Sequence, residues 1–344
     1  HHRPELEHGE RTLKDARKTS KDRRSPLHTV AFSRDNRILA MGGVAPFVAT
    51  FDAESGNAFE TYPVASGAVT ALAYTHEGDL TAATTKYTTT AWQLDPNWEL
   101  DHVITPSENT DGNSPALVGR VLALAFTPEG ETLAAGSGVP SRSGTISLWR
   151  VPDGEPVKQL PESHSDTIFS LQFSPDGRYL ASGAADKLVN VFHASNGELA
   201  NTFEGHTHHV LDVTWHRGSQ LLASSGADKV INVWDTKDGE RVENFSIFKK
   251  HVTSIQYLAY KNELVVSAGD PKVGIVKHNG KDFRELPGPD SYMYCTDATT
   301  DGKIVAAGGD DGILYIWDHE GKLIAEFHPD NTGAQAEEPD GEDE

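Results

Sequence analysis

Three residue types that hydrolytic enzymes use occur together in the middle of this 344-residue chain. They are His206, Ser224 and Asp228, and the same types recur as His164, Ser182 and Asp186. A serine deprotonated by a histidine that a carboxylate orients performs acyl transfer. Each serine here lies within an apolar-alternating run, however, and no glycine-flanked nucleophile turn surrounds it. We therefore predict that neither set is catalytic.

A histidine cluster raises the question of a metal site. His206, His208 and His209 lie close together, but consecutive strand positions point to opposite faces of a sheet, so His208 and His209 do not converge. Cys295 is the only cysteine of the sequence, which excludes an internal disulfide and a cysteine-based zinc or iron–sulfur site. No glycine motif of the phosphate-binding kind occurs. We predict no metal and no cofactor.

The elements that carry these residues repeat along the chain. Residues 169–203 and 211–245 match almost position for position, and each stretch holds four short apolar-alternating runs separated by turn residues. Alternation with a period of two is typical of half-buried antiparallel strands, and the Asp-Gly and Asn-Gly pairs between runs suit tight hairpins. Each repeat is therefore predicted to be a sheet of four strands, a to d in chain order.

An aromatic residue near the end of the third run marks most repeats. The markers are Phe51, Trp92, Trp149, Phe192, Trp234 and Trp317, with Lys277 at the sixth position. Their spacing is 40–43 residues, apart from one interval of 57 between Trp92 and Trp149. A four-stranded propeller blade takes about 40–45 residues. The sequence thus predicts an all-β fold, a seven-bladed β-propeller of four-stranded antiparallel blades, over residues 27–328.

The fifth repeat carries the most specific motif. GHTHHVLDVTW followed by LASSGADKVINVWD resembles the GH-to-WD signature of the WD-repeat family, which is good in the fourth repeat and degenerate in the first, second, sixth and seventh. The resemblance implies a structural relay of hydrogen bonds between the loop that enters a blade and its b–c turn. The relay residues implied are His206, Ser224, Asp228 and Trp234 in the fifth repeat and His164, Ser182 and Asp186 in the fourth. The fourth relay is shortened, because Phe192 has no indole N–H to donate.

A narrower resemblance concerns the source of the protein. The stretches RSGTISLW, ESHSDTIFSLQFSPDGRYLASGAADK and GHTHHVLDV are similar to propeller arrays of planctomycete proteins that carry a c-type cytochrome domain upstream. This resemblance implies a bacterial protein, periplasmic or exported, that docks an attached redox domain; without it the expected location is the cytoplasm. The chain has no CxxCH motif, so a haem domain would lie outside it.

The two ends of the chain differ from the repeats. Residues 1–26 hold eight Lys/Arg and five Asp/Glu with few apolar side chains, which predicts a charged linker. Residues 329–344 hold seven carboxylates and no basic residue, which predicts a disordered acidic tail. The WD-repeat family usually completes its last blade with an N-terminal strand. Here residues 322–327 alternate as a strand does, so we expect the seventh blade to be completed by its own strand and the ring to close by side-chain packing.

Charge and hydropathy limit the classes of partner. The formal net charge is −21, and nucleic-acid binding depends on cationic groups that displace counterions from phosphates. No run of 18 apolar residues occurs, so no membrane insertion is predicted. We expect protein partners, for a chain that fits one module of a larger multidomain protein.

The interval of 57 residues predicts two insertions in the third repeat. One lies in the d–a connection around residues 105–118 and the other in the b–c turn around residues 136–144. Both emerge on the same face, because the chain direction alternates from strand to strand, and their Ser, Asn, Gly and Pro are typical of adaptable surface loops. The predicted partner-binding residues are Asn109, Asp111, Asn113, Arg120, Arg142 and His208.

The function predicted from these patterns is that of a non-catalytic scaffold for protein interactions, with partners bound through the d–a and b–c loops. One alternative is a propeller that binds a glycan or another small ligand. Another is an enzyme with a pocket over the central channel, which needs acids, bases or metal ligands that converge from several blades. The sequence does not display such a set.

Overall fold

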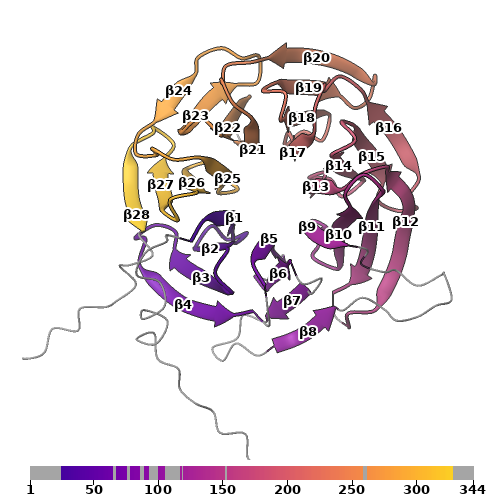
Figure 1. The fold of residues 1–344 in the computed structure, drawn as a ribbon, viewed down its shortest axis with the longest axis horizontal. Coiled ribbons are helices and arrows are strands. Elements are labelled where there is room, and N and C mark those ends of the chain that lie inside the picture. Colours follow the sequence, from indigo (N-terminus) through magenta and orange to yellow (C-terminus); the bar gives the residue numbers. More distant parts are fainter. Residues whose placement is uncertain are drawn as a thin grey trace, which may run out of the picture.

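Seven sheets of four strands stand side by side in a ring, with the first strand of each sheet nearest the centre and the fourth at the rim (Figure 1). This computed structural model describes residues 25–64, 67–75, 78–85, 89–92, 100–104, 117, 119–151, 153–258 and 262–327, and only the backbone of residues 91–92, 100–104 and 161–162. Neighbouring strands of a sheet are antiparallel. The predicted seven-bladed β-propeller is confirmed.

Every blade consists of four consecutive strands, called a to d from the centre outward. The strands are β1 (Leu27–Phe32), β2 (Ile38–Gly43), β3 (Phe47–Asp52) and β4 (Ala58–Pro63) in blade 1; β5 (Val69–Tyr74), β6 (Leu80–Thr84), β7 (Thr89–Trp92) and β8 (Leu100–Ile104) in blade 2; β9 (Arg120–Phe126), β10 (Thr132–Val139), β11 (Ser143–Arg150) and β12 (Pro156–His164) in blade 3; β13 (Ile168–Phe173), β14 (Tyr179–Ala184), β15 (Val189–His193) and β16 (Leu199–Phe203) in blade 4; β17 (Val210–Trp215), β18 (Leu221–Gly226), β19 (Ile231–Asp235) and β20 (Glu240–Phe245) in blade 5; β21 (Val252–Tyr257), β22 (Glu263–Ala268), β23 (Lys272–Lys277) and β24 (Arg284–Leu286) in blade 6; and β25 (Met293–Ala298), β26 (Ile304–Gly309), β27 (Leu314–Asp318) and β28 (Leu323–Phe327) in blade 7. No helix in the described part of the chain is long and apolar enough to cross a membrane.

The buried apolar side chains of the described residues form seven layers, each between two neighbouring blades. Successive residues of a strand supply different layers, because they point to opposite faces of the sheet. In β14, Leu180 packs in the layer shared with blade 3, whereas Ala181 packs in the layer shared with blade 5. Each blade is therefore held on both faces, and the position of its loops depends on both neighbours.

The seventh blade ends in its own outer strand, as expected. β28 pairs with β27, and the apolar layer between blades 7 and 1 closes the ring. The rings of Phe51 and Phe327 lie 4.7 Å apart in this layer. The N–H of Phe32 also donates to Asp297 Oδ2 at 2.9 Å, across the seam between the two blades. Side-chain packing and a few hydrogen bonds thus replace a strand shared between the ends of the chain.

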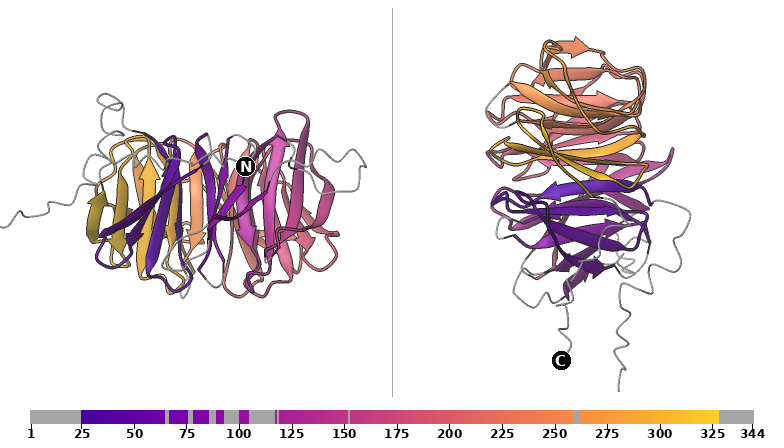
Figure 2. Two further views of the ribbon diagram at one scale, coloured as in Figure 1. Left: turned by 90° about the horizontal axis from the view of Figure 1, so that it is seen from below. Right: turned by 90° about the vertical axis from the view of Figure 1, so that its left-hand side faces the viewer.

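The third blade differs from the sequence prediction. β10 and β11 have eight residues each and pair along their whole length, so most of residues 136–144 belong to strands and only residues 140–142 form a turn. Figure 2 shows this magenta hairpin standing above the neighbouring blades. The predicted insertion is therefore present at this place, but the prediction that it forms a loop is wrong. The additional residues lengthen a hairpin, in which backbone pairing satisfies N–H and C=O groups that a loop would leave to water.

Candidate functional site

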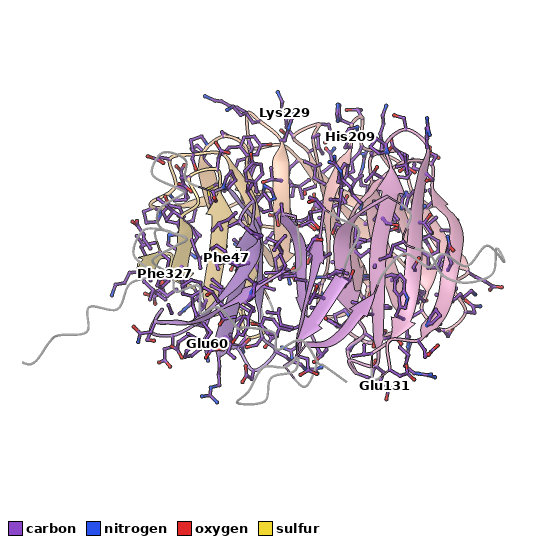
Figure 3. All side chains as sticks on the ribbon, turned by 60° about the horizontal axis from the view of Figure 1, so that its bottom comes forward. Phe47, Glu60, Glu131, His209, Lys229 and Phe327 are labelled. Atoms are coloured by element: carbon purple, nitrogen blue, oxygen red, sulfur yellow. The ribbon has the colours of Figure 1, made fainter. Side chains whose placement is uncertain are left out.

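The d–a loops and the b–c turns lie on one face of the ring, called the upper face from here on. Lys229, between β18 and β19, and His209, before β17, mark this face, while Glu131, between β9 and β10, lies on the other (Figure 3). The two kinds of connection must emerge together, because the chain direction alternates from a to d. The residues of the two relays implied by the sequence lie where these loops and turns meet.

In blade 5 a chain of hydrogen bonds joins the d–a loop to the b–c turn. His206 Nδ1 lies 3.0 and 3.1 Å from the carboxylate oxygens of Asp228, and His206 Nε2 lies 2.8 Å from Ser224 Oγ. The indole N–H of Trp234 donates to the same serine oxygen at 2.8 Å. With Nδ1 protonated, donation runs in one direction, from Trp234 through Ser224 and His206 to Asp228. His206, Ser224 and Trp234 are buried, so the chain satisfies polar atoms that water does not reach.

Blade 4 brings together a similar but shorter set. His164 Nδ1 lies 2.9 and 3.0 Å from the oxygens of Asp186, and His164 Nε2 lies 2.7 Å from Ser182 Oγ. Phe192 occupies the position of the indole and is buried. The hydrogen-bonded chain therefore ends at the serine hydroxyl.

The aspartates of these two blades also hold the loop backbone. Asp228 accepts the N–H of Thr207 at 2.7 Å and that of Val230 at 3.2 Å, and Asp186 makes the equivalent bonds in blade 4. Desolvation acts to raise the pKa of Asp228, but the hydrogen bonds with His206 and the backbone outweigh it and hold this pKa below its ordinary value. The same balance lowers the pKa of Asp186. Both carboxylates are charged at neutral pH and are occupied in fixing the loops.

Blade 6 fixes its loop without a histidine, which the sequence analysis missed. Asp270 occupies the position of Asp228 and accepts the N–H groups of Lys249 and Lys250, both at 3.3 Å. Phe248 occupies the position of the histidine and is buried. The signal that could have found this anchor is the aspartate just after the second strand of the repeat, which the fourth to seventh repeats share.

Of the six predicted partner-binding residues, the structure describes three. Arg120 begins β9 and Arg142 lies in the turn between β10 and β11, so both exposed side chains belong to the upper end of blade 3. His208 is exposed two blades away, with its ring centroid 4.3 Å from that of His209 and 6.4 Å from that of His251. The structure therefore does not join the arginines and the histidine in one cluster. The expectation that His208 and His209 point apart is wrong, because both precede β17 and neither belongs to a strand. Asn109, Asp111 and Asn113 lie outside the described residues.

The turn of the blade 3 hairpin is fixed to the next blade. The N–H of Ser141, a residue in the left-handed conformation with φ of +59°, donates to Asp166 Oδ1 at 2.7 Å. Asp166 belongs to the loop before β13 and also accepts the N–H of Thr167 at 2.7 Å. A turn held in this way does not have the adaptable character that its composition suggested.

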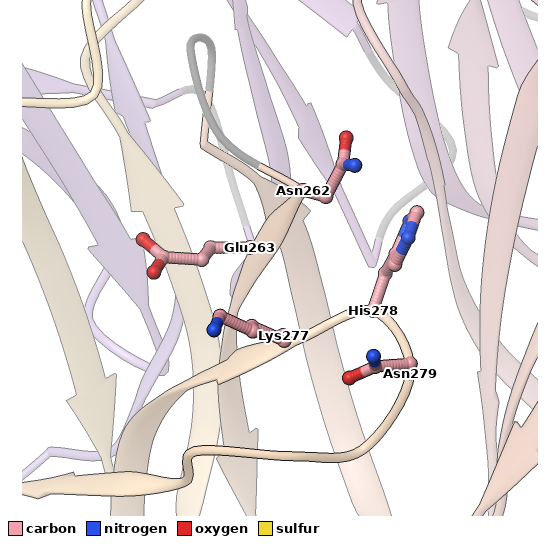
Figure 4. A pocket seen from close by; sticks show the side chains of 5 residues that line it. All are labelled: Asn262, Glu263, Lys277, His278 and Asn279. Carbon is pink, nitrogen blue, oxygen red and sulfur yellow. The ribbon is translucent and has the colours of Figure 1, made fainter.

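A hollow of about 370 Å³ lies in blade 6, on the face opposite to the relays. Figure 4 shows its lining at the ends of β22 and β23 and in the turns beside them: Asn262, Glu263, Lys277, His278 and Asn279. Desolvation, followed by repulsion from His216, lowers the pKa of His278. These side chains can hydrogen-bond a small polar ligand, but no Trp, Tyr or Phe ring among them offers a face for stacking a sugar.

Catalytic and metal-binding uses of the histidine clusters find little support in this geometry. Ser182 and Ser224 have no exposed surface, and His206 already has partners at both ring nitrogens. Within the described ranges, no group of three or more His, Cys, Asp or Glu side chains is placed to hold a metal ion.

Comparison with known families identifies the repeats that hold the two relays. Four stretches, residues 114–150, 154–193, 197–235 and 280–318, match the family model described as "WD domain, G-beta repeat". The chain contains WD40 repeats. The matches at 154–193 and 197–235 end in the third strands of blades 4 and 5, so these WD40 repeats hold the two hydrogen-bonded relays. Blades 1 and 2 lie outside the matched stretches, but they too have four strands each.

Several curated relatives resemble parts of the chain. It is 31% identical over 207 residues to nuclear distribution protein PAC1 of Coccidioides posadasii, which covers 58% of this chain and 41% of that protein. It is 35% identical over 100 residues to the chromatin assembly factor 1 subunit FAS2 homolog of Oryza sativa, covering 28% and 19%. It is 30% identical over 124 residues to F-box-like/WD repeat-containing protein TBL1X of Mus musculus, covering 32% and 22%. The chain thus spans less than half the length of these relatives.

The source of the relatives corrects one expectation. The matched proteins named above are eukaryotic, so the prediction of a bacterial protein is contradicted. The narrower resemblance to planctomycete arrays with a cytochrome domain is likewise not supported. The stretches that suggested it belong to the WD40 repeat signature itself, and turn and core requirements common to all such blades do not distinguish one source from another.

Proposed function

We propose that this chain is a non-catalytic protein-interaction module whose partners bind the upper face. The observation that carries the proposal is that carboxylates in the b–c turns of blades 4, 5 and 6 hold the adjacent d–a loops by their backbone N–H groups. The side chains next to these anchors are exposed on a fixed framework. Binding to such a surface loses less conformational entropy than binding to mobile loops.

Two further observations support a non-catalytic role. The relay serines have no exposed surface, so a substrate cannot reach their hydroxyl groups. The name of one relative describes a chromatin assembly factor subunit, a protein that works in an assembly with others. We propose the same general mode of action for this chain, with partners of its own.

The proposal is tested by changing one face at a time. One double variant, Arg142→Glu with His208→Glu, places negative charge on the upper face. The other, Lys237→Glu with Lys281→Glu, places negative charge on the opposite face. All four side chains are exposed. Each variant and the intact chain are used to capture proteins from native extract, and the captured proteins are compared by mass spectrometry. We expect the upper-face variant to lose proteins that the opposite-face variant retains. Equal sets from all three chains would contradict the proposal.

The hollow in blade 6 favours a second candidate function, the binding of a small polar ligand. Its amide, imidazole and charged groups offer hydrogen bonds but little apolar surface. A ligand that binds only the folded state raises the melting temperature. A thermal-shift screen of soluble glycans and small acids against the intact chain and the Asn262→Ala variant tests this candidate. Stabilisation that disappears in the variant would support it, and the absence of any shift would contradict it.

A further inference from the structure

Four lysine side chains are exposed on the upper face of blades 4 to 6, on a chain of net charge −21. The exposed ammonium groups are those of Lys187, Lys229, Lys249 and Lys250. None of them takes part in the ion pairs found among the residues that the structure describes. Blade 6 contains a contrasting case, because Lys272 at the start of β23 is paired with Glu285.

The carboxylates of this region do not neutralise these lysines. Asp166, Asp186, Asp228 and Asp270 each accept one or more backbone N–H groups at distances of 2.7–3.3 Å. Backbone N–H dipoles directed at a carboxylate compensate part of its charge. These four acidic groups thus serve the loops, and the exposed charges beside them are those of the four lysines and of Glu204, in the loop before β17.

Three imidazoles lie on the same face of blades 5 and 6 as these lysines. The ring of His208 contacts those of His209 and His251, and the ring of His209 lies 5.9 Å from that of Phe169 on the inner strand of blade 4. Desolvation, followed by the charge of His208, lowers the pKa of His209, although the charge of Asp166 acts to raise it. The lysines and imidazoles are therefore exposed or half-buried on the upper face of three successive blades, 4 to 6.

Two of the lysines occupy an unfavourable backbone conformation. Lys187 and Lys229 have φ of +76° and +71°, in the left-handed region. The equivalent turn of blade 7 uses Gly312, with φ of +71°, and glycine adopts this conformation without the clash that a Cβ causes. A strained position that is filled twice by the same charged residue suggests a use for the side chain.

We propose that an acidic segment of a partner protein docks on this surface, here called the basic patch. Its residues are Lys187, Lys229, Lys249, Lys250, His208, His209 and His251. The inference rests on the proposed function and specifies the class of partner. Charge complementarity favours a short segment rich in Asp and Glu, because Asp290 and Asp310 are exposed on the upper face of blade 7 and would repel a polyanion that extended beyond the patch, such as a nucleic acid.

The test measures the binding of a short fluorescein-labelled peptide rich in glutamate, and of its glutamine counterpart, by fluorescence anisotropy. The Lys187→Gly and Lys229→Gly double variant removes two charges and relieves the left-handed strain, so its melting temperature should be equal to or higher than that of the intact chain. The Lys249→Ala and Lys250→Ala double variant removes charge from blade 6. The matched control is Lys237→Ala with Lys281→Ala, which removes two exposed lysines from the opposite face.

We expect the glutamate peptide to bind and the glutamine peptide not to bind, with roughly 3- to 20-fold weaker binding to each basic-patch variant and a change of less than about twofold in the control. Raising the salt concentration should weaken binding. Equal losses in the control, or no preference for glutamate, would overturn the proposal. If extract proteins still distinguish the two faces while the glutamate peptide does not bind, the interaction face stands and the acidic class of partner is wrong.

The acidic residues 329–344 of the chain itself are a competing occupant, so every measurement is repeated without them. Equal binding with and without this segment supports docking of a partner. Binding that is seen only after its removal would assign the basic patch to the chain's own acidic segment and overturn docking of a partner.

Discussion

Blades 5 and 7 place a tryptophan at the same position and use it differently. In blade 5 the indole N–H of Trp234 begins the chain that ends at Asp228, which links the b–c turn to the d–a loop. In blade 7 the indole N–H of Trp317 donates directly to the carbonyl oxygen of Pro287, in the loop before β25, at 2.8 Å. A buried indole needs an acceptor, and the fold supplies one in either way.

The turn aspartates of the two blades differ in the same manner. Asp311 of blade 7 occupies the position of Asp228 but accepts the hydroxyl of Tyr315 from its own blade, at 3.0 Å. Of these two blades, blade 5 alone has a turn carboxylate bonded to a histidine from the d–a loop, as blade 4 also has. Blade 5 therefore holds its loop by a relay of side chains. Blade 7, which also closes the ring, holds its loop by the indole bond and by the N–H groups of Asp310 and Asp311, which donate to Tyr292 O and Ser291 Oγ.

The largest expected effect comes from removing residues 322–344, which deletes β28. Strand β27 would lose its outer partner, and Phe51 would lose its contact with Phe327 at the seam. We expect the melting temperature to fall by about 5 °C or more, because loss of a strand and of buried apolar area destabilises both blades 7 and 1. Thermal unfolding followed by circular dichroism measures the change.

Two shorter deletions are the controls for this experiment. Removal of residues 329–344 keeps β28, and removal of residues 1–24 keeps Pro26, whose carbonyl accepts the N–H of Val44 at 3.0 Å. We expect each to shift the melting temperature by less than about 2 °C, since neither deletes a strand. A loss on removal of residues 1–24 as large as that on removal of β28 would mean that blade 7 depends on the N-terminal segment.

Substitutions in the blade 5 relay should have the next largest effect on stability. His206→Ala and Asp228→Ala are each expected to lower the free energy of unfolding by about 1–3 kcal/mol, and the double variant by less than the sum. The folded pKa of Asp228 lies below its ordinary value, so this stabilisation is present at neutral pH and is lost as the pH falls through that lowered pKa. Urea unfolding at neutral and acidic pH tests both statements. Strict additivity at neutral pH would show that the two side chains are not coupled.

The repeat pattern of the sequence predicted some of these features and missed others. The repeat pattern predicted seven blades and the outer strand at residues 322–327, because strand periodicity and turn chemistry are local. It did not predict the blade 6 anchor, since Phe248 in place of a histidine hides the role of Asp270. It predicted a loop for residues 136–144, because the same composition can form a loop or a longer hairpin. The hairpin that forms is held by a hydrogen bond to Asp166 of the next blade. Which carboxylates accept backbone N–H groups depends on contacts between distant parts of the chain, and a sequence pattern does not contain these contacts.

A buried aspartate at the ring seam makes the stability of the fold depend on pH. Two aspartates lie on inner strands: Asp212 of blade 5 accepts four hydrogen bonds, whereas Asp297 of blade 7 accepts the N–H groups of Phe32 and Ala298 alone. Desolvation raises the pKa of both carboxyls, and that of Asp297 reaches about 7. A raised acid pKa means that the folded state loses stability as the pH rises from about 4 through 7.

The Asp297→Asn variant removes this titration. Between pH 5 and pH 8 the free energy of unfolding of the variant should therefore rise, relative to that of the intact chain, by more than about 1 kcal/mol. One pKa unit corresponds to about 1.4 kcal/mol. Asparagine cannot accept both N–H groups with two oxygens, so the variant is expected to be the less stable chain at the acidic end. Urea unfolding at several pH values gives the difference directly, and a difference independent of pH would show that Asp297 is not the group responsible.

The smallest expected effect separates the two tryptophans. Blade 4 already has Phe192 beside a histidine–serine pair, so Trp234→Phe should leave His206 and Asp228 in place and cost about 0.5–1 kcal/mol for one hydrogen bond. Trp317→Phe should cost a similar amount but release the loop that its indole holds. Hydrogen exchange is the readout that separates them: amides of residues 288–292 should exchange several-fold faster in Trp317→Phe, while those of residues 205–209 stay nearly unchanged in Trp234→Phe. Equal acceleration in both loops would mean that the indole, and not the aspartate and histidine, holds the loop in blade 5 as well.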